Sequence, residues 1–434
     1  MNHSVESMPL WLSIPFAVML LLIAVGPLLF EHWWEKNKNK LLVSLALGVP
    51  VAIILIAKGL QHELMHQILF DYIPFIVLLG ALFIITGGIH LKGDIKPRPI
   101  TNTLFLAIGG ILASFMGTTG AAMLLIRPVI NTISKREHKV HTILFFIAIV
   151  ANTGGILTPL GDPPLFLLYL RSTPFTWFFT LFNEWMFIMI SLLTIYFFVD
   201  THYYRKEVRD KNELEVFSTK IKIIGKRNFY FLAGVVLAVA FLNENYIEAF
   251  HHNHYLGFIR EGVIVLMAIL SLYYTQNEMR YTHNRFTWGP IVEVAFLFLG
   301  IFITMTPTLI YLKENAQAFN LDQPWQFYYA TGSLSAFLDN APTAVSFHNL
   351  AMGMTASFPG AKIVGQIPEV LLRAISVSAV FFGAMTYIGN GPNFMVKAIA
   401  EEHQIKMPSF FGYILKFSLV VLLPVYILTQ LIFL

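Results

Sequence analysis

Long apolar stretches separated by short polar ones recur along the whole chain. They lie at residues 9–30, 41–60, 72–91, 102–125, 141–170, 178–199, 229–243, 259–274, 289–312, 327–350, 370–401 and 409–432. Most approach the roughly 20 residues that a helix needs to cross a bilayer. Because lipid offers no hydrogen-bonding partners to the backbone, stretches of this kind must be helical. The pattern therefore predicts an all-α polytopic membrane protein.

One long polar stretch divides these segments into two groups of equal size. It covers residues 200–228 and is rich in Lys, Arg, Glu and Asp. We expect residues 1–199 to form a first transmembrane repeat and residues 200–228 to form a cytoplasmic linker. Residues 229–434 would then form a second, inverted repeat.

Two polar blocks recur in both halves, in the same order. The first block is ASFMGTTGAA at 113–122 and SAFLDNAPTA at 335–344. The second block is GILTPLGDPPLF at 155–166, which aligns without gaps with GAMTYIGNGPNF at 383–394. The second block shares Gly155 with Gly383, Thr158 with Thr386, Gly161 with Gly389, Pro164 with Pro392 and Phe166 with Phe394. Asp162 stands opposite Asn390. We interpret the blocks as a re-entrant hairpin and a broken transmembrane helix in each repeat.

The distribution of basic residues predicts how the repeats are oriented. If 102–125 and 327–350 are re-entrant hairpins, each half crosses the membrane an odd number of times, so the second copy is inverted. This topology places 23 of the 29 Lys and Arg residues on one face and the other six on the opposite face. The positive-inside rule assigns the first face to the cytoplasm. The first hairpin would open to the cytoplasm and the second to the outside, with both termini outside.

Composition agrees with this interpretation. Of the 434 residues 56% are hydrophobic and 12% charged, and the mean hydropathy is +0.66, which excludes a soluble protein. Cysteine is absent, so disulfides and thiolate metal sites are excluded. The net charge of +4 comes from loops and fits topology signals, so we expect the lipid bilayer as partner and no nucleic acid. The first apolar run lacks a preceding basic residue and a small-residue cleavage site, so we expect a retained span.

The polar blocks also predict chemistry. Glycine and proline must interrupt the helices at 154–164 and 389–392, and such backbone survives at membrane depth only inside protein or beside water. Freed carbonyl groups accept cations, and exposed helix N-termini favour anions. Together with the hairpin tips they would form an oxygen-rich site suited to a hard cation such as Na⁺.

Asp162 and Asp339 are the carboxylates that the pattern places deepest in the bilayer. A buried carboxylate is costly, so it normally binds a partner ion or carries a proton. We therefore predict that both bind the transported ion or substrate, with Na⁺ held by them and neighbouring carbonyls. The residues expected to complete the site are Thr118, Thr119, Asn152, Thr153, Thr158, Gly161, Asn340, Thr343, Thr386, Asn390 and Asn393. The alternative is that the two acids only cap helix ends, and capping or packing is an equal alternative for Asn152, Thr153 and Asn393.

One further motif points to a different class of protein. The segment His62-Glu63-Leu64-Met65-His66 matches the H-E-x-x-H pattern of zinc proteases. It lies at an outer boundary between two spans, without an evident third ligand nearby. An intramembrane metalloprotease is therefore a distant alternative, and we expect a protein that is not an enzyme.

The motifs GILTPLGDPPLF and SAFLDNAPTA, with the inverted repeat, resemble the ion transporter superfamily, over roughly residues 70 to 434. Within it the chain is similar to NhaD-type sodium/proton antiporters and to a related citrate transporter group. The resemblance implies a homodimer of two layers, in which hairpins and broken helices move like an elevator against a scaffold. Dicarboxylate carriers of the superfamily show Ser-Asn-Thr at both hairpin tips. This chain has Gly117-Thr118-Thr119 and Asp339-Asn340-Ala341 instead, which adds an acid that would repel an anion.

These observations favour Na⁺(Li⁺)/H⁺ exchange through Asp162 and Asp339. The alternative is cation-coupled transport of citrate or another carboxylate, in which helix N-termini receive the anion. The ions would be transported substrates, and we expect no resident cofactor. We expect the protein in a bacterial inner membrane.

Overall fold

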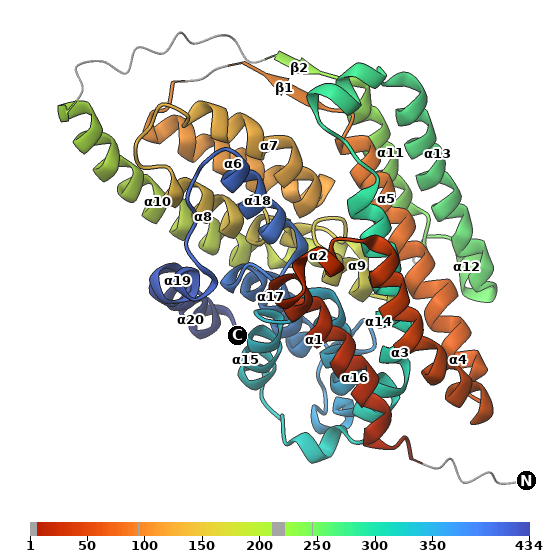
Figure 1. Ribbon diagram of the computed structural model, residues 1–434. Coiled ribbons are helices and arrows are strands. Elements are labelled where there is room, and N and C mark those ends of the chain that lie inside the picture. Colours follow the sequence, from red (N-terminus) through yellow and green to blue (C-terminus); the bar gives the residue numbers. More distant parts are fainter. Residues whose placement is uncertain (1–6, 94–95, 211–221, 245) are drawn as a thin grey trace, which may run out of the picture.

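Helices make up almost all of the regular structure (Figure 1). The computed structural model describes residues 7–93, 96–210, 222–244 and 246–434. The helices are α1 (Ile14–Leu29), α2 (Glu31–Trp34), α3 (Asn37–Ala57), α4 (Gln61–His66), α5 (Ile73–Thr86), α6 (Pro99–Met116), α7 (Thr118–Thr132), α8 (Val140–Ile149), α9 (Pro163–Leu170), α10 (Phe182–Asp210), α11 (Arg227–Phe241), α12 (Glu248–His252), α13 (Phe258–Tyr274), α14 (Gly289–Glu314), α15 (Pro324–Ser335), α16 (Asn340–Gly353), α17 (Glu369–Phe382), α18 (Gly391–Glu402), α19 (Phe410–Tyr413) and α20 (Leu423–Phe433). Strand β1 (His90–Lys92) pairs antiparallel with β2 (Lys222–Ile224), and β3 (Ile363–Val364) pairs antiparallel with β4 (Ile367–Pro368).

Nine helical stretches within the described residues are long and apolar enough to cross a membrane. Two of them, Gln61–Thr86 and Phe410–Phe433, contain a π-helical segment between two α-helices. Large apolar side chains face outward, and Phe198, Leu415 and Leu431 are 66%, 62% and 70% exposed. Water would penalise such a surface, whereas lipid does not. The predicted fold class is confirmed: the chain is an all-α integral membrane protein.

Each half contains a helical hairpin that turns at the first polar block. In the first half α6 and α7 are joined by Gly117 alone, and in the second half α15 and α16 are joined by residues 336–339. Gly117 has a φ of +82°, a left-handed value that costs glycine little. The first hairpin can therefore reverse direction within a single residue.

Each half also contains a helix that is broken at the second polar block. Helix α8 ends at Ile149 and α9 begins at Pro163, while α17 ends at Phe382 and α18 begins at Gly391. A proline lies in the first turn of α9 and of α18. An N–H group there has no partner within the helix, so proline costs no hydrogen bond at this place. The two breaks therefore fall where the glycine and proline pattern predicts them.

Equivalent contacts hold each broken helix against the hairpin of its own half. The Thr158 hydroxyl donates to the carbonyl oxygen of Ser114, and the Thr386 hydroxyl donates to that of Ala336 at 2.5 Å. Ser114 and Ala336 occupy the same place in the aligned first block. The two threonines shared by the repeat thus have the same structural task.

Paired glycines let the broken segments fold back on themselves. A Cβ atom at Gly161 would lie 1.8 Å from the carbonyl oxygen of Gly155. In the second half a Cβ at Gly389 would lie 2.7 Å from the carbonyl oxygen of Gly383. The alignment pairs these same four glycines, so the sequence repeat reflects one backbone arrangement formed twice.

The helices form two groups that lie side by side. Helices α3, α5, α11 and α13 lie on the right of Figure 1, and α1 and α14 pack on α3. The two hairpins and two broken helices form the other group together with α10 and α20. Helix α14 packs against α16, and α5 packs against α7 and α9, so the groups meet along the hairpins and α9.

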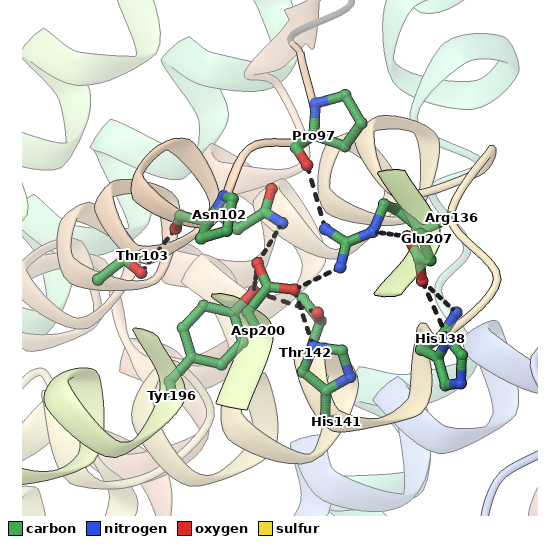
Figure 2. A network of polar contacts seen from close by, with 11 residues as sticks. Pro97, Asn102, Thr103, Arg136, His138, His141, Thr142, Tyr196, Asp200 and Glu207 are labelled. Carbon is green, nitrogen blue, oxygen red and sulfur yellow. Dashed lines mark hydrogen bonds and ion pairs between the residues drawn. The ribbon is translucent and has the colours of Figure 1, made fainter. Parts of the chain in front are cut away.

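Helix α10 continues to Asp210, although the sequence pattern placed the start of the linker at residue 200. The reason is that polar residues of α10 are buried by ion pairs (Figure 2). Arg136 Nη2 lies 2.9 Å from Asp200 Oδ1, and Arg136 Nε pairs with Glu207 Oε2. Asp200 and Glu207 are two helical turns apart and so lie on one face of α10. Residues 211–221 of the predicted linker lie outside the described residues.

The same network connects α10 to the base of the first hairpin. Asn102 on α6 donates to Asp200 at 3.0 Å, and His141 on α8 lies 2.9 Å from it. Arg136 itself follows α7 and also donates to the carbonyl oxygen of Pro97 at 3.1 Å. Figure 2 shows these groups converging on the two carboxylates of α10.

We expect Gly161→Ala to prevent folding, because the added methyl group would overlap the carbonyl oxygen of Gly155. The expected loss of unfolding free energy exceeds about 4 kcal/mol. It can be measured as loss of monodisperse protein and of Tm in detergent. Gly262→Ala is the control: nothing lies within 4 Å of its Cβ, and alanine favours helix α13. Equal behaviour of the two variants would contradict the packing described.

We expect Arg136→Gln to lower the unfolding free energy by about 3–5 kcal/mol, because it leaves two buried carboxylates without their cation. The matched control is Arg285→Gln, whose ion pair with Glu402 is 61% and 53% exposed and is worth less than about 1 kcal/mol. Thermal melts of both variants in detergent measure the difference. Melting temperatures that fall together would show that the Arg136 network contributes no special stability.

Candidate functional site

The hairpin tips and the broken helices of both halves meet at the side chain of Asp162, which is 1% exposed. Its Oδ1 accepts hydrogen bonds from the hydroxyl of Thr118 at 2.7 Å and from Nδ2 of Asn390 at 3.0 Å. Its Oδ2 accepts a hydrogen bond from Nδ2 of Asn340 at 2.6 Å. Each of the four polar blocks therefore supplies one residue to a single centre.

The repeat alignment explains which residues meet there. Asp162 and Asn390 are equivalent positions of the second block, and they contact each other directly. Thr118 and Asn340 are equivalent positions of the first block, and both donate to the same carboxylate. Equivalent residues can touch in this way only where the two copies of the unit meet.

All three donors to Asp162 are neutral. Among the described residues no Lys, Arg or His forms an ion pair with this carboxylate. A buried carboxylate without a basic partner is a large electrostatic cost, which binding of a cation or a proton removes. The centre is therefore chemically suited to take up one positive charge.

A second oxygen atom near the carboxylate supports this assignment. Asn340 is fully buried, and its Oδ1 has no hydrogen-bond partner among the described residues. An unpaired buried acceptor costs about 1–3 kcal/mol. An amide oxygen beside a carboxylate is a donor set that suits a hard cation such as Na⁺, so the residues present fit that ion.

Three asparagines connect the two halves behind the carboxylate. Asn152 donates to Oδ1 of Asn393 at 2.7 Å and accepts a hydrogen bond from Asn390 at 3.1 Å. Asn393 in turn donates to the carbonyl oxygen of Gly383 at 2.7 Å. All three side chains are buried. These amides hold Asn390 in place and make the geometry at Asp162 depend on both halves.

Asp339 has a different environment from Asp162. It is half-buried, and its Oδ1 accepts the backbone N–H of Ala341 at 3.0 Å, which makes it the N-cap of α16. Its carbonyl oxygen accepts the hydroxyl of Thr343 at 2.9 Å. The capping alternative therefore describes the contacts of Asp339, whereas Asp162 makes no cap hydrogen bond to α9.

The remaining predicted residues support the backbone around the centre. The hydroxyl of Thr153 donates to the carbonyl oxygen of Ala148 at 2.9 Å, and the carbonyl of Gly161 accepts the N–H of Thr118 at 2.7 Å. Thr158 and Thr386 hold the broken segments as described above. In the described part of the chain Thr119 makes no side-chain hydrogen bond.

Sequence reasoning missed Ser114 in this region. Its hydroxyl donates to the carbonyl oxygen of Gly154 at 2.5 Å and accepts the N–H of Leu157 at 3.2 Å. It therefore satisfies backbone groups that the break in the helix leaves unpaired. The available signal was a serine inside an apolar run, three positions before the hairpin tip.

The H-E-x-x-H segment forms the short helix α4. No group of three or more His, Cys, Asp or Glu side chains that could hold a metal ion occurs in the described residues. His66 lies against the ring of Phe70, with the ring centroids 5.1 Å apart. Within the described residues the metalloprotease alternative therefore finds no zinc site.

Comparison with known proteins shows the family to which the chain belongs. The chain matches a family described as "Putative citrate transport" over residues 5–434. The chain belongs to this family. As a member of it the protein is a membrane transporter, and the similarity to NhaD-type antiporters stays a prediction.

A further comparison covers a smaller part of the chain. Over 108 residues the chain is 28% identical to Inner membrane protein YbiR of Escherichia coli (strain K12). The match covers 22% of this chain and 29% of that protein. The match therefore extends over less than a third of YbiR.

We expect Thr118→Val to lower the unfolding free energy by about 2 kcal/mol, because the Asp162 carboxylate loses one of its three donors. Thr119→Val on the next residue should change it by less than about 0.5 kcal/mol. Melting temperatures in detergent compare the two, since both substitutions replace one β-branched side chain with another. A larger effect of Thr119→Val would contradict the geometry of the hairpin tip.

Proposed function

We propose that the protein is a secondary active transporter that couples a cation, Na⁺ or H⁺, to the movement of citrate or another carboxylate. In this proposal Asp162 binds the coupling ion. The observation that carries it is the buried Asp162 carboxylate, which has three neutral donors and, among the described residues, no basic partner.

The coupling follows from electrostatics. An ionised Asp162 repels an anionic substrate, and repulsion between like charges is strong in a medium of low dielectric constant. A bound cation or proton cancels the charge and removes the repulsion. The carboxylate substrate therefore binds well only together with the ion, and this is the condition for symport.

The anion would be received by helix ends. Helices α7 and α18 begin at Thr118 and Gly391, close to the Asp162 carboxylate, and no side chain caps either of them. A helix N-terminus carries a partial positive charge and free N–H donors, which favour carboxylates. Membership of the citrate transport family supports a carboxylate as cargo.

Na⁺(Li⁺)/H⁺ exchange is the second candidate, and the sequence pattern favoured it. The specific observation in its favour is that the Asp162 carboxylate and the unpaired Oδ1 of Asn340 are oxygen ligands of the kind that bind Na⁺, and neither requires an organic substrate. We rank it second because family membership favours a carboxylate. A bacterial inner membrane, termini outside and a homodimer stay predictions.

Proteoliposomes containing the purified protein separate these functions. We expect radiolabelled citrate to accumulate inside the vesicles under an inward Na⁺ or proton gradient. Without either gradient, its inside concentration should rise no higher than the outside concentration. We expect Asp162→Asn to lower gradient-driven accumulation at least tenfold. Asp339→Asn should have the smaller effect, because Asp339 caps α16 and an asparagine also caps helices well.

The same vesicles decide the second candidate. A pH-sensitive dye inside them reports proton movement when Na⁺ or Li⁺ is added without citrate. Exchange without citrate, together with no citrate accumulation under any gradient, would replace symport by antiport. Full gradient-driven accumulation in Asp162→Asn would overturn the role given to this residue.

A further inference from the structure

The ribbon formed by β1 and β2 lies at one end of the helix group that contains α5, α11 and α13 (Figure 1). Three residues separate β1 from α5, and two residues separate β2 from α11. Helix α5 is the last part of Gln61–Thr86, a stretch long and apolar enough to cross a membrane. Because the ribbon follows so soon after the end of this span, it lies at the level of the lipid headgroups.

The ribbon is fixed firmly to the helix ends. Gly225, between β2 and α11, has a φ of +79°, and a Cβ atom there would lie 2.0 Å from the carbonyl oxygen of Gly88. Nδ2 of Asn228 donates to the same carbonyl oxygen at 2.8 Å. Nδ2 of Asn284 donates to the carbonyl oxygen of Ile89 at 2.8 Å. The side chains of the ribbon therefore project from a backbone that is held in one place.

Basic side chains gather on this ribbon and beside it. Lys92 and Lys222 are directly opposite each other across the two strands, so their side chains lie on the same face. Like charges in this arrangement destabilise a sheet. Lys226 and Arg227 follow closely, and the first turn of α11 contains no acidic residue. All four side chains are exposed, and none of them forms an ion pair within the described residues.

Exposed apolar and aromatic side chains accompany these charges. Ile223 and Ile224 on β2 are each 40% exposed. Cζ of Arg227 lies 5.9 Å from the ring centroid of Tyr274, which is 51% exposed at the end of α13. Tyr230 in the first turn of α11 is 77% exposed. Tyrosine is enriched where a membrane protein meets the headgroups, whereas exposed isoleucine gains nothing from contact with water.

We propose that this surface, formed by Lys92, Lys222, Lys226 and Arg227, binds the headgroups of anionic phospholipids. Basic side chains close to a membrane attract anionic lipids, and a phosphate group between the two opposed lysines removes their repulsion. The isoleucines of β2 contact the acyl chains of the same lipids. Bound lipid thus holds the ends of α5 and α11 at the membrane surface. The inference does not depend on which ion or carboxylate the protein transports.

Thermal melts of the purified full-length protein in a neutral detergent test the binding. The added lipids are phosphatidylglycerol, which is anionic, and phosphatidylcholine with the same acyl chains. We expect phosphatidylglycerol to raise the Tm by about 3 °C more than phosphatidylcholine, because a ligand that binds the folded state stabilises it. About 0.5 M NaCl should remove this difference, since salt screens exposed charges. Equal Tm values with the two lipids at low salt would overturn the proposal.

Two double substitutions test the place. We expect Lys92→Gln with Lys222→Gln to remove at least half of the difference between the lipids. The Tm of this variant without added lipid should stay the same or rise, because the repulsion between the lysines is lost. Lys36→Gln with Lys38→Gln is the control: it removes the same charge from exposed lysines of the same predicted face and should keep the full difference. An undiminished difference in the first variant, or equal losses in both variants, would overturn the assignment to the ribbon.

Soluble phosphates distinguish a lipid from a free anion. The same melts are recorded with inorganic phosphate and with glycerol 3-phosphate at the concentration used for phosphatidylglycerol. We expect neither to raise the Tm, because neither carries acyl chains to contact the exposed isoleucines. A rise as large as that with phosphatidylglycerol would overturn the lipid assignment, since the surface would then bind a soluble anion.

Discussion

The architecture depends on one buried carboxylate without a basic partner among the described residues, which lies where two helices are interrupted. Asp162 lies at the meeting point of two interrupted helices and two hairpin tips, and its only hydrogen-bond donors in the described structure are a threonine hydroxyl and two amides. Non-helical backbone at membrane depth needs partners, and Ser114, Thr158 and Thr386 supply them. Asp162 is 1% exposed, so the surrounding helices separate its carboxylate from lipid. Among the described residues no basic side chain pairs with this carboxylate. We propose that a mobile coupling ion neutralises it.

The sequence allowed the general architecture to be predicted because its determinants are local. Apolar length predicts helices, and glycine with proline predicts breaks, whatever the helices pack against. The alignment of Gly161 with Gly389 and of Thr158 with Thr386 was informative because each pair makes one contact within its own half. The break positions and both hairpins follow from such local constraints.

The candidate site could be predicted only in part, because its geometry depends on contacts between distant segments. Thr118 and Thr119 are adjacent in sequence, yet only Thr118 reaches Asp162. The sequence pattern predicted ion binding by both Asp162 and Asp339, but it did not show that the Asp339 carboxylate caps α16. The sequence also did not reveal that Asp200 and Glu207 are buried, because a run of charged residues is typical of a solvated linker. Their partner Arg136 lies 64 and 71 residues earlier in the chain (Figure 2).

The central claim is that Asp162 binds the ion that is coupled to transport. The most direct test counts the cations bound by purified protein, with radiolabelled Na⁺ and with proton uptake between alkaline and acidic pH, for the wild type and for Asp162→Asn. The account predicts that the variant binds one cation fewer, either Na⁺ or H⁺, while its folded state stays intact. Equal binding of both ions by the wild type and the variant would contradict it.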